Sequence, residues 1–360
     1  MKLHFYIAKH VFLIMLAVLA VIMSIDLVFG IIGEARAIGL HGYTWHNAIL
    51  YILLRLPSDM TLIFPIAGFL GTLIALLILS SKSELIAMRV SGFSLRQIAG
   101  AVMITGFSTL IFYYALALFI APYARHLSYL EQNTHGSDQN ILILSTETWL
   151  KSGDHFLLMG EVLPDGEINN VTDFVVQDGA LEEIRKIKSI ILHPNETWTL
   201  NDVSIMQLSK NGTTKTYSEH ITEPSLISET LLPALAMEPD EMMIHTLASY
   251  ITFRKQNNLN VKSYELQFWD RIFNPLTLPI LMLIAIPFGM SHNRGSIQYR
   301  IVGSLVVGFA FYIIDQFFGS ITMLSPLPAI FGAAIPPLLF GLLTLGLFRA
   351  CRPKFFRSEK

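Results

Sequence analysis

The sequence predicts a membrane α-helical protein with six transmembrane helices, arranged three plus three around an inserted antiparallel β domain of β-jellyroll-like pattern. Hydrophobic residues make up 52% of the 360 positions and charged residues 14%, an apolar excess too large for an ordinary soluble protein. Six apolar stretches approach the ~20 residues that a helix needs to cross a hydrocarbon core. Between the third and fourth stretches, the pattern changes to short β-rich runs separated by turn residues.

The six predicted spans also define an orientation. Most lysines and arginines near the span ends lie on the side of the two termini, whereas the short segments on the other side hold only Arg36 and Arg55. We therefore expect both termini in the cytoplasm and the β domain outside it. The first span is longer than a signal-peptide core and should stay uncleaved. The spans lie at about Val11–Ile32, Pro57–Leu79, Ile98–Ala121, Phe273–Met290, Ile301–Met323 and Ala329–Phe348.

Four regions follow from this pattern. Strand-like runs separated by turns such as Asn211-Gly212 extend over about Gln132–Thr222 and predict a sandwich or jelly roll. An amphipathic helical pattern over Asp240–Asn257 then leads back to the membrane. The expected regions are 1–121, with three spans and a short cytoplasmic helix at about 81–92; 122–238, the β domain; 239–268, a connecting amphipathic helix; and 269–360, with three spans and a cytoplasmic tail.

Motifs for catalysis are absent from the sequence. No P-loop, H-E-x-x-H, C-x-x-C or G-x-S-x-G occurs. Cys351 is the single cysteine, so an intrachain disulfide and a cysteine metal site are both excluded. A formal net charge of −2 and the lack of a basic tract give no indication of nucleic-acid binding. We expect no catalytic residue, metal or cofactor in this chain.

The segment after the second span predicts a short exposed helix on the cytoplasmic side. Ser81 and Glu84 have the spacing of a capping box, and Gly92 is placed to end the helix. Leu85 and Met88, or Leu85 and Ile86 with Val90, give it an apolar edge. Such a helix either lies on the lipid headgroups, with Glu84 serving only as a cap, or fits into a groove of a soluble partner.

Ionisable groups inside the spans suggest a second site. Asp26 lies in the first span, and Asp315 and Gln316 lie in the fifth. Because a charge in hydrocarbon is costly, such residues face a protein interior or a cavity. They either stabilise helix packing, line a polar part of a substrate cavity, or couple ion movement to transport.

Two arginines lie just outside the membrane, beside helix ends. Arg36 and Arg125 either extend toward lipid headgroups or bind an anionic lipid group, because guanidinium binds phosphate through two nitrogens.

Several of these segments together resemble the LptF/LptG permease family, and the resemblance covers essentially the whole chain. The resemblance is closer to the LptG branch than to the LptF branch, although Gly30 and Ala37 stand where the family's first helix carries further lysines. The matching segments are Ser83-Glu84-Leu85 with Met88, Ser91-Gly92-Phe93, Tyr264-Glu265-Leu266 with Trp269, Phe273-Asn274-Pro275-Leu276, and Phe311 to Gly319 with its Asp315-Gln316 pair.

This resemblance implies a permease subunit of an ABC-type lipopolysaccharide exporter in the bacterial inner membrane. It implies an LptF-like second permease, an LptB-like cytoplasmic ATPase that holds ATP and Mg, and LptC-like and LptA-like periplasmic β-jellyroll proteins that carry lipopolysaccharide toward the outer membrane. The predicted coupling residues are Glu84, Leu85, Met88 and Gly92, and the candidate lipid-binding residues are Arg36, Arg125, Phe64, Asp26, Asp315 and Gln316.

Three other functions stay open on the residues alone. One is a scaffold whose β domain recruits other proteins, which would need no coupling helix. An ion-coupled secondary transporter would use Asp26 and Asp315, and it predicts a symmetry between two halves that the sequence does not display. A non-transporting permease that relays force from an ATPase to a periplasmic partner would have the same layout, without a lipid-filled space.

Overall fold

The structure is a computed structural model that forms two compact units. The helical unit comprises residues Met1–Glu34, Ile52–Ala124 and Lys262–Lys360, and the β unit comprises Ala35–Tyr51 and Arg125–Val261. The predicted tail at 351–360 and the predicted turn at 164–166 lie outside the described residues. Those described are 2–36, 38–39, 43–136, 148–162, 167–177, 179–193, 197–209, 212–226, 237–290 and 297–350.

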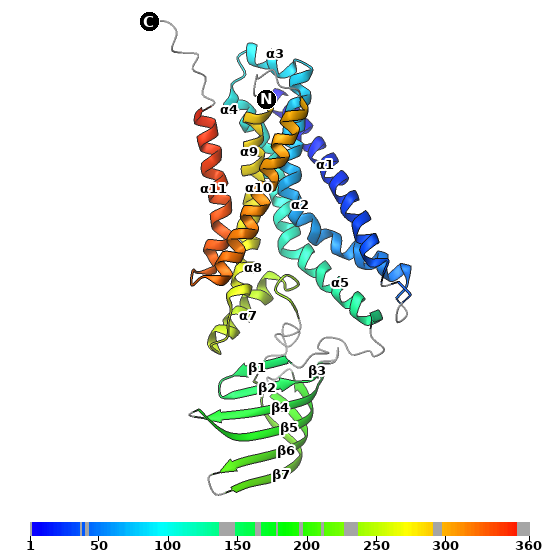
Figure 1. Cartoon of the computed structure of the whole chain (residues 1–360), viewed down its shortest axis with the longest axis vertical. Coiled ribbons are helices and arrows are strands. Elements are labelled where there is room, and N and C mark those ends of the chain that lie inside the picture. Colours follow the sequence, from blue (N-terminus) through cyan, green and yellow to red (C-terminus); the bar gives the residue numbers. More distant parts are fainter. Residues whose placement is uncertain are drawn as a thin grey trace. The chain divides into compact units, whose positions relative to one another are not determined.

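Each predicted span lies within one helix or one continuous helical run (Figure 1). Five described helical runs are long and apolar enough to cross a membrane. In α10 the apolar stretch, Gly308–Leu324, is shorter than in these five. The helices are α1 (Lys2–Glu34), α2 (Trp45–Ser81), α3 (Glu84–Val90), α4 (Leu95–Ala115), a π-helical turn η1 (Leu116–Ile120), α5 (Ala121–Gly136), α7 (Ile244–Gln256), α8 (Lys262–Phe273), a 3₁₀ turn η2 (Asn274–Leu276), α9 (Thr277–Met290), α10 (Ile297–Leu324) and α11 (Ala329–Ala350).

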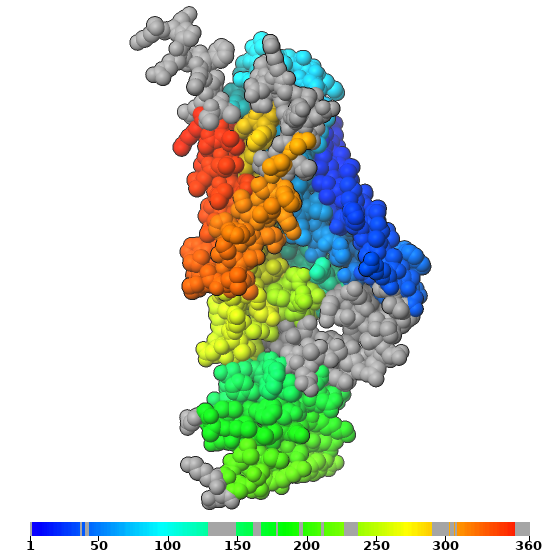
Figure 2. Space-filling view, in the orientation of Figure 1, coloured from blue at the N-terminus to red at the C-terminus, as the bar shows by residue number. Residues whose placement is uncertain are grey.

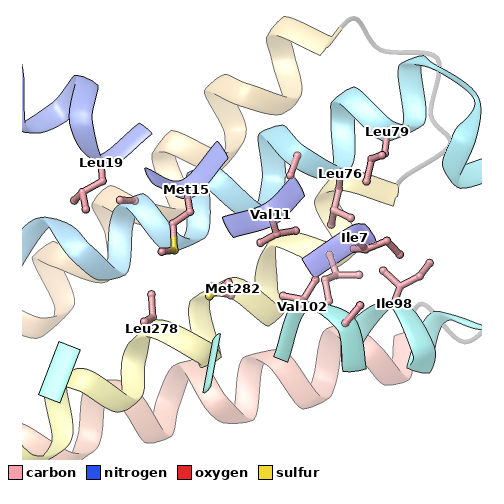
Figure 3. Close-up of a cluster of buried hydrophobic side chains, with 14 of the residues drawn as sticks. Ile7, Val11, Met15, Leu19, Leu76, Leu79, Ile98, Val102, Leu278 and Met282 are labelled. Atoms are coloured by element: carbon pink, nitrogen blue, oxygen red, sulfur yellow. The ribbon is translucent and has the colours of Figure 1, made fainter. Parts of the chain in front are cut away.

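The core of the helical unit forms where α1, α2, α4 and α9 meet. Figure 3 shows the apolar side chains of the four helices converging. Helix α1 contributes Ile7, Val11, Met15 and Leu19, which share one face because they recur every four residues. After Leu19, the described part of α1 buries only Gly30. The outer half of α1 therefore presents apolar side chains outward.

Helices α1 and α2 approach each other most closely at a glycine. A Cβ atom at Gly71 of α2 would lie 2.4 Å from the Met15 Cα of α1. No side chain fits there, so glycine is what permits this crossing.

The β unit holds one antiparallel sheet in the order β1-β2-β4-β5-β6-β7, with β3 paired to β4 (Figure 1). Among the described residues this is a single sheet, which confirms the inserted antiparallel domain; its strands begin later than the predicted Gln132. The strands are β1 (Thr148–Ser152), β2 (His155–Met159), β3 (Glu161–Val162), β4 (Glu167–Gln177), β5 (Ala180–His193), β6 (Thr197–Ser209) and β7 (Gly212–Pro224).

An irregularity at the same level on strands β4 to β7 bends this sheet, and we call it the crease. In an ordinary strand, residues three apart point to opposite faces, yet Ile187 and Ile190 of β5 are both buried, as are Leu200 and Val203 of β6. On each of the strands β4 to β7, one residue at this level is left out of the regular cross-strand pairing. These four unpaired positions form a row across the sheet, and two of them have left-handed backbone conformations. Asparagine and aspartate tolerate this conformation better than other side chains do. The row comprises Asn170 (φ 56°), Lys188, Asp202 (φ 53°) and Glu219.

The crease divides the sheet into two walls that share one interior. Buried side chains of both walls form a single cluster that includes Trp198, and Phe253 of α7 packs against it. Helix α7 buries Leu247 and Tyr250, so its amphipathic prediction is confirmed. The single connecting helix predicted over 239–268 is wrong, because the chain leaves the helical conformation at Asn257–Val261 and α8 belongs to the helical unit.

Candidate functional site

Helix α3 is closed by a glycine C-cap. The Phe93 N–H donates to the Met88 carbonyl (2.9 Å) and the Gly92 N–H to the Arg89 carbonyl (3.0 Å), the two bonds of a Schellman motif. Gly92 has φ +90°, where side chains are strained. The predicted stop at Gly92 therefore has a physical cause. The predicted capping box at Ser81 is wrong: α2 continues through Ser81, and the α3 N-cap is Ser83, whose side chain makes no capping bond.

The apolar residues of α3 divide between a buried face and an exposed face. Leu85 is 3% exposed and packs into the helical core, while Met88 lies half-buried beside it. Leu85 therefore anchors α3 and does not face a partner. The exposed apolar residues are Ile86 (45%) and Val90 (85%), one turn apart on one face. Both residues belong to one of the two apolar edges predicted from the sequence, although the third member of that edge, Leu85, is buried.

Glu84 lies at the edge of a hollow beside this stripe. Its Oε2 accepts a hydrogen bond of 2.7 Å from the Tyr6 hydroxyl of α1. The hollow has a volume of about 420 Å³. Glu84 thus joins α3 to the start of α1 and does more than cap its own helix. The lining residues are Leu3, Tyr6, Glu84, Ala87, Met88, Ser91 and Phe93.

A larger hollow lies between α2 and α10 in the membrane-spanning part of the helical unit. Its volume is about 530 Å³, within the range of pockets that bind small molecules. Its lining is almost wholly apolar, and Val306 and Phe309 are each 63% exposed. Figure 2 shows the outward surfaces of α10 (orange) and α1 (dark blue) on the same face, with α2 between them. Ile66, Leu70, Val306, Gly308, Phe309 and Tyr312 form the lining.

Phe64, a predicted lipid-binding residue, does not line this hollow. It is 2% exposed and stacks on Tyr113 of α4 at 5.0 Å between ring centroids. Tyr113 in turn donates to the Thr61 carbonyl at 2.7 Å. Phe64 is therefore a core residue that joins α2 to α4, and its side chain is not accessible to a lipid in this structure.

Asp26 has polar partners on α2 that the sequence did not suggest. Its carboxyl lies within hydrogen-bonding reach of Asp59, and Asp59 accepts a 2.6 Å bond from the Arg55 Nε. One turn further along α1, Gly30 packs on Ile52. Asp26 therefore lies on the side of α1 that faces α2, next to Asp59 and Arg55.

The two polar residues of α10 point to different surroundings. Gln316 is exposed, whereas Asp315 is half-buried and lies near Asp270 of α8. The structure thus brings Asp315 together with Asp270, a residue that sequence reasoning missed.

The two arginines predicted to bind lipid, Arg36 and Arg125, differ in their surroundings. Arg36 is exposed after the end of α1, and Ala37 lies outside the described residues. Arg125 of α5 pairs with Asp240, 3.4 Å from Nε to Oδ2. Next to Asp240, Glu241 is 5% exposed, and burial together with the nearby Asp240 and Glu238 raises its pKa to about 7. Arg125 is thus paired within a cluster of acidic side chains in the β unit.

The fold defines a class: a multi-pass membrane protein with an inserted antiparallel β domain and an apolar hollow between two of its membrane helices. The chain belongs to the family described as "Lipopolysaccharide export system permease LptF/LptG", whose sequence model matches residues 5–350. It is 29% identical to the lipopolysaccharide export system permease protein LptG of Escherichia coli strain K12 over 351 residues, 95% of this chain and 96% of that protein.

A second relative with the same description is equally similar to this chain. The chain is 29% identical to LptG of Haemophilus influenzae strain Rd over 338 residues, 93% of this chain and 94% of the relative. As a permease component of this export system, the chain works in a complex with other Lpt proteins at the inner membrane.

Proposed function

We propose that this chain is the LptG-type subunit that extracts lipopolysaccharide from the inner membrane and passes it to a periplasmic β-jellyroll bridge toward the outer membrane. The observation that carries the proposal is the apolar hollow between α2 and α10, whose rim residue Phe309 faces outward from the helical unit. An apolar space of this size suits acyl chains. It argues against the ion-coupled alternative, which requires a polar path.

Extraction requires an energy source outside this chain. Removing one acyl chain from a bilayer costs about 0.8 kcal/mol per methylene, so a chain of ordinary length costs roughly 10 kcal/mol. A lipid with several chains does not leave unaided at a useful rate. We infer an LptB-like ATPase partner that binds ATP and Mg, and an LptF-like permease that completes the substrate space against the exposed outer half of α1.

Helix α3 supplies the contact for such an ATPase. Ile86 and Val90 are exposed apolar residues beside Glu84, and the Schellman motif at Gly92 holds the helix at a fixed position. The bond between Tyr6 and Glu84 then links movement of α3 to α1. In this proposal both termini lie in the cytoplasm and the β domain lies in the periplasm, where LptC-like and LptA-like proteins receive the lipid.

Co-purification with a matched control tests the proposal. The chain is isolated from its native membranes in mild detergent, and bound proteins are identified by mass spectrometry. We expect an ABC ATPase and a second permease, and an Ile86→Ser/Val90→Ser variant should lose the ATPase while it keeps the permease. Ile104→Ser is the control, because Ile104 on α4 is similarly exposed (53%). Equal ATPase recovery from all three proteins would refute the role of α3.

A further inference from the structure

The outer face of one wall of the β unit carries two rows of side chains that each cross six strands, and we call them the outer rows. The first row consists of Lys151, Phe156, Phe174, Ile184, Met206 and Lys215, in direct cross-strand register. The second consists of Trp149, Leu158, Thr172, Lys186, Ser204 and Tyr217. The row between them begins with Leu150, Leu157 and Asp173, which are all buried. Because successive residues of a strand point to opposite faces, the outer rows point away from the interior.

The outer rows are unusually apolar for a sheet face that lies opposite the domain core. Such a face normally carries polar side chains, yet seven of these twelve positions are apolar or aromatic. Trp149 is 61% exposed and Met206 36%. Trp149 stacks on Phe174 at 5.7 Å between ring centroids, and the Lys151 amine lies 5.2 Å from the Phe156 ring. An exposed apolar patch with aromatic side chains is typical of a contact site.

The charges of the outer rows have one sign. The three charged positions are all lysines, and none of the twelve positions holds an aspartate or a glutamate. Asp202 reaches this face through the Tyr217 hydroxyl, which donates to its Oδ1 at 2.6 Å, but Lys188 already pairs with Asp202 at 3.1 Å. An apolar surface that carries only positive charge is complementary to an apolar surface that carries carboxylates.

Two other occupants suit this face less well. A second copy of this chain would oppose lysines to lysines with no carboxylate between them, because identical faces meet in a two-fold contact. Binding to a lipid surface buries apolar side chains ~5–10 Å below the headgroups, whereas Phe156 and Phe174 are half-buried and lie against neighbouring side chains.

The size of the face suits a protein. Six strands spaced about 4.8 Å apart make the outer rows roughly 24 Å long. A standard contact patch of about 800 Å² per partner is about 28 Å across. The outer rows therefore have the width of a protein–protein contact.

We propose that the outer rows are a docking surface for another protein on the same side of the membrane as the β domain, one whose contact surface is apolar and carries carboxylates. Trp149 and Met206 are covered by apolar side chains of that partner, and Lys186 and Lys215 pair with its carboxylates. Desolvated aromatic and apolar residues supply most of the affinity of such a contact, while the charges fix its orientation.

Carbodiimide crosslinking tests the docking surface, because this reagent joins a lysine amine to a carboxylate where the two are in contact. Whole cells that contain the full-length chain are made permeable to the carbodiimide, and linked peptides are identified by mass spectrometry. We expect Lys186 and Lys215 to link to aspartates or glutamates of another protein, beside apolar residues. The pair of Lys188 and Asp202 is the internal control, since its amide forms within the folded β unit.

Two matched variants test the apolar part of the surface. Met206→Ser should lower the yield of the Lys186 and Lys215 products about tenfold, as loss of a central contact residue does. Ile191→Ser is the control, because Ile191 is similarly exposed (41%) but pairs with Thr199 on the other wall. It should leave the yield unchanged, and both variants should keep the product between Lys188 and Asp202.

Three results would overturn the inference. Products of Lys186 and Lys215 with this chain alone, within one molecule or between two copies, would assign the face to the protein itself. Equal loss of the products in Met206→Ser and Ile191→Ser would remove the apolar contact. No product with another protein, while Lys188 links to Asp202, would exclude an acidic protein partner, and it is also the result that contact with lipid phosphates would give.

Discussion

Replacing Gly71 by alanine should separate α1 from α2. The added Cβ would lie 2.4 Å from the Met15 Cα and 2.9 Å from its backbone nitrogen. Carbon atoms need about 3.5–4.0 Å, so the two helices must move apart by about 1 Å. Overpacking of this kind costs about 1–3 kcal/mol, against which alanine returns at most about 1 kcal/mol of helix propensity.

Gly100 provides the matched control, because it lies within α4 and a Cβ there meets nothing within 4 Å. Gly100→Ala should be neutral or stabilising. We expect the two variants to differ by about 2 kcal/mol in stability. Thermal melting of the purified protein in detergent measures this difference, and hydrogen exchange should show protection lost in α1. Equal melting of Gly71→Ala and Gly100→Ala would refute the close-crossing argument.

Three further predictions concern other parts of the chain. Gly92→Ala should strain the α3 C-cap by about 1 kcal/mol and lower ATPase recovery in the co-purification assay; unchanged recovery would show that the cap is dispensable. Arg55→Met should destabilise the helical unit by about 2 kcal/mol, because it removes the partner of Asp59 beside Asp26. The double variant Arg55→Met/Asp59→Leu should regain part of that stability, measured by thermal melting in detergent. Burial raises the pKa of the Glu241 carboxyl from 4.5 to about 7, so its contribution to folding stability is complete below pH 4.5 and lost as pH rises through 7. Glu241→Gln should flatten the dependence of the melting temperature on pH, and an unchanged pH profile would contradict this prediction.

The membrane spans could be predicted from the sequence because hydropathy over about 20 residues is a strong one-dimensional signal. The same holds for the end of α3 at Gly92, where glycine marks a left-handed cap. The amphipathic face of α7 was also predictable, since Leu247, Tyr250 and Ile251 recur at helical spacing.

Contacts between distant elements could not be predicted in this way. Leu85 and Ile86 are adjacent and similarly apolar, and only the packing of α1 and α4 decides which of them is buried. Phe64 lies in an apolar span, where nothing local separates a core residue from a lipid-facing one. The crease in the sheet depends on the alignment of Asn170 and Asp202 across strands, which follows from register alone.

The most direct test of the account is to ask where lipopolysaccharide contacts the helical unit. A benzophenone amino acid is placed at Phe309, on the rim of the hollow, or at Phe107, an aromatic residue of α4 with similar exposure (63% and 56%). Membrane vesicles with the full export complex are irradiated with and without ATP. The account predicts lipopolysaccharide crosslinks at Phe309 that decrease when ATP drives transport, and none above background at Phe107. Equal crosslinking at both positions, or none at Phe309, would contradict it.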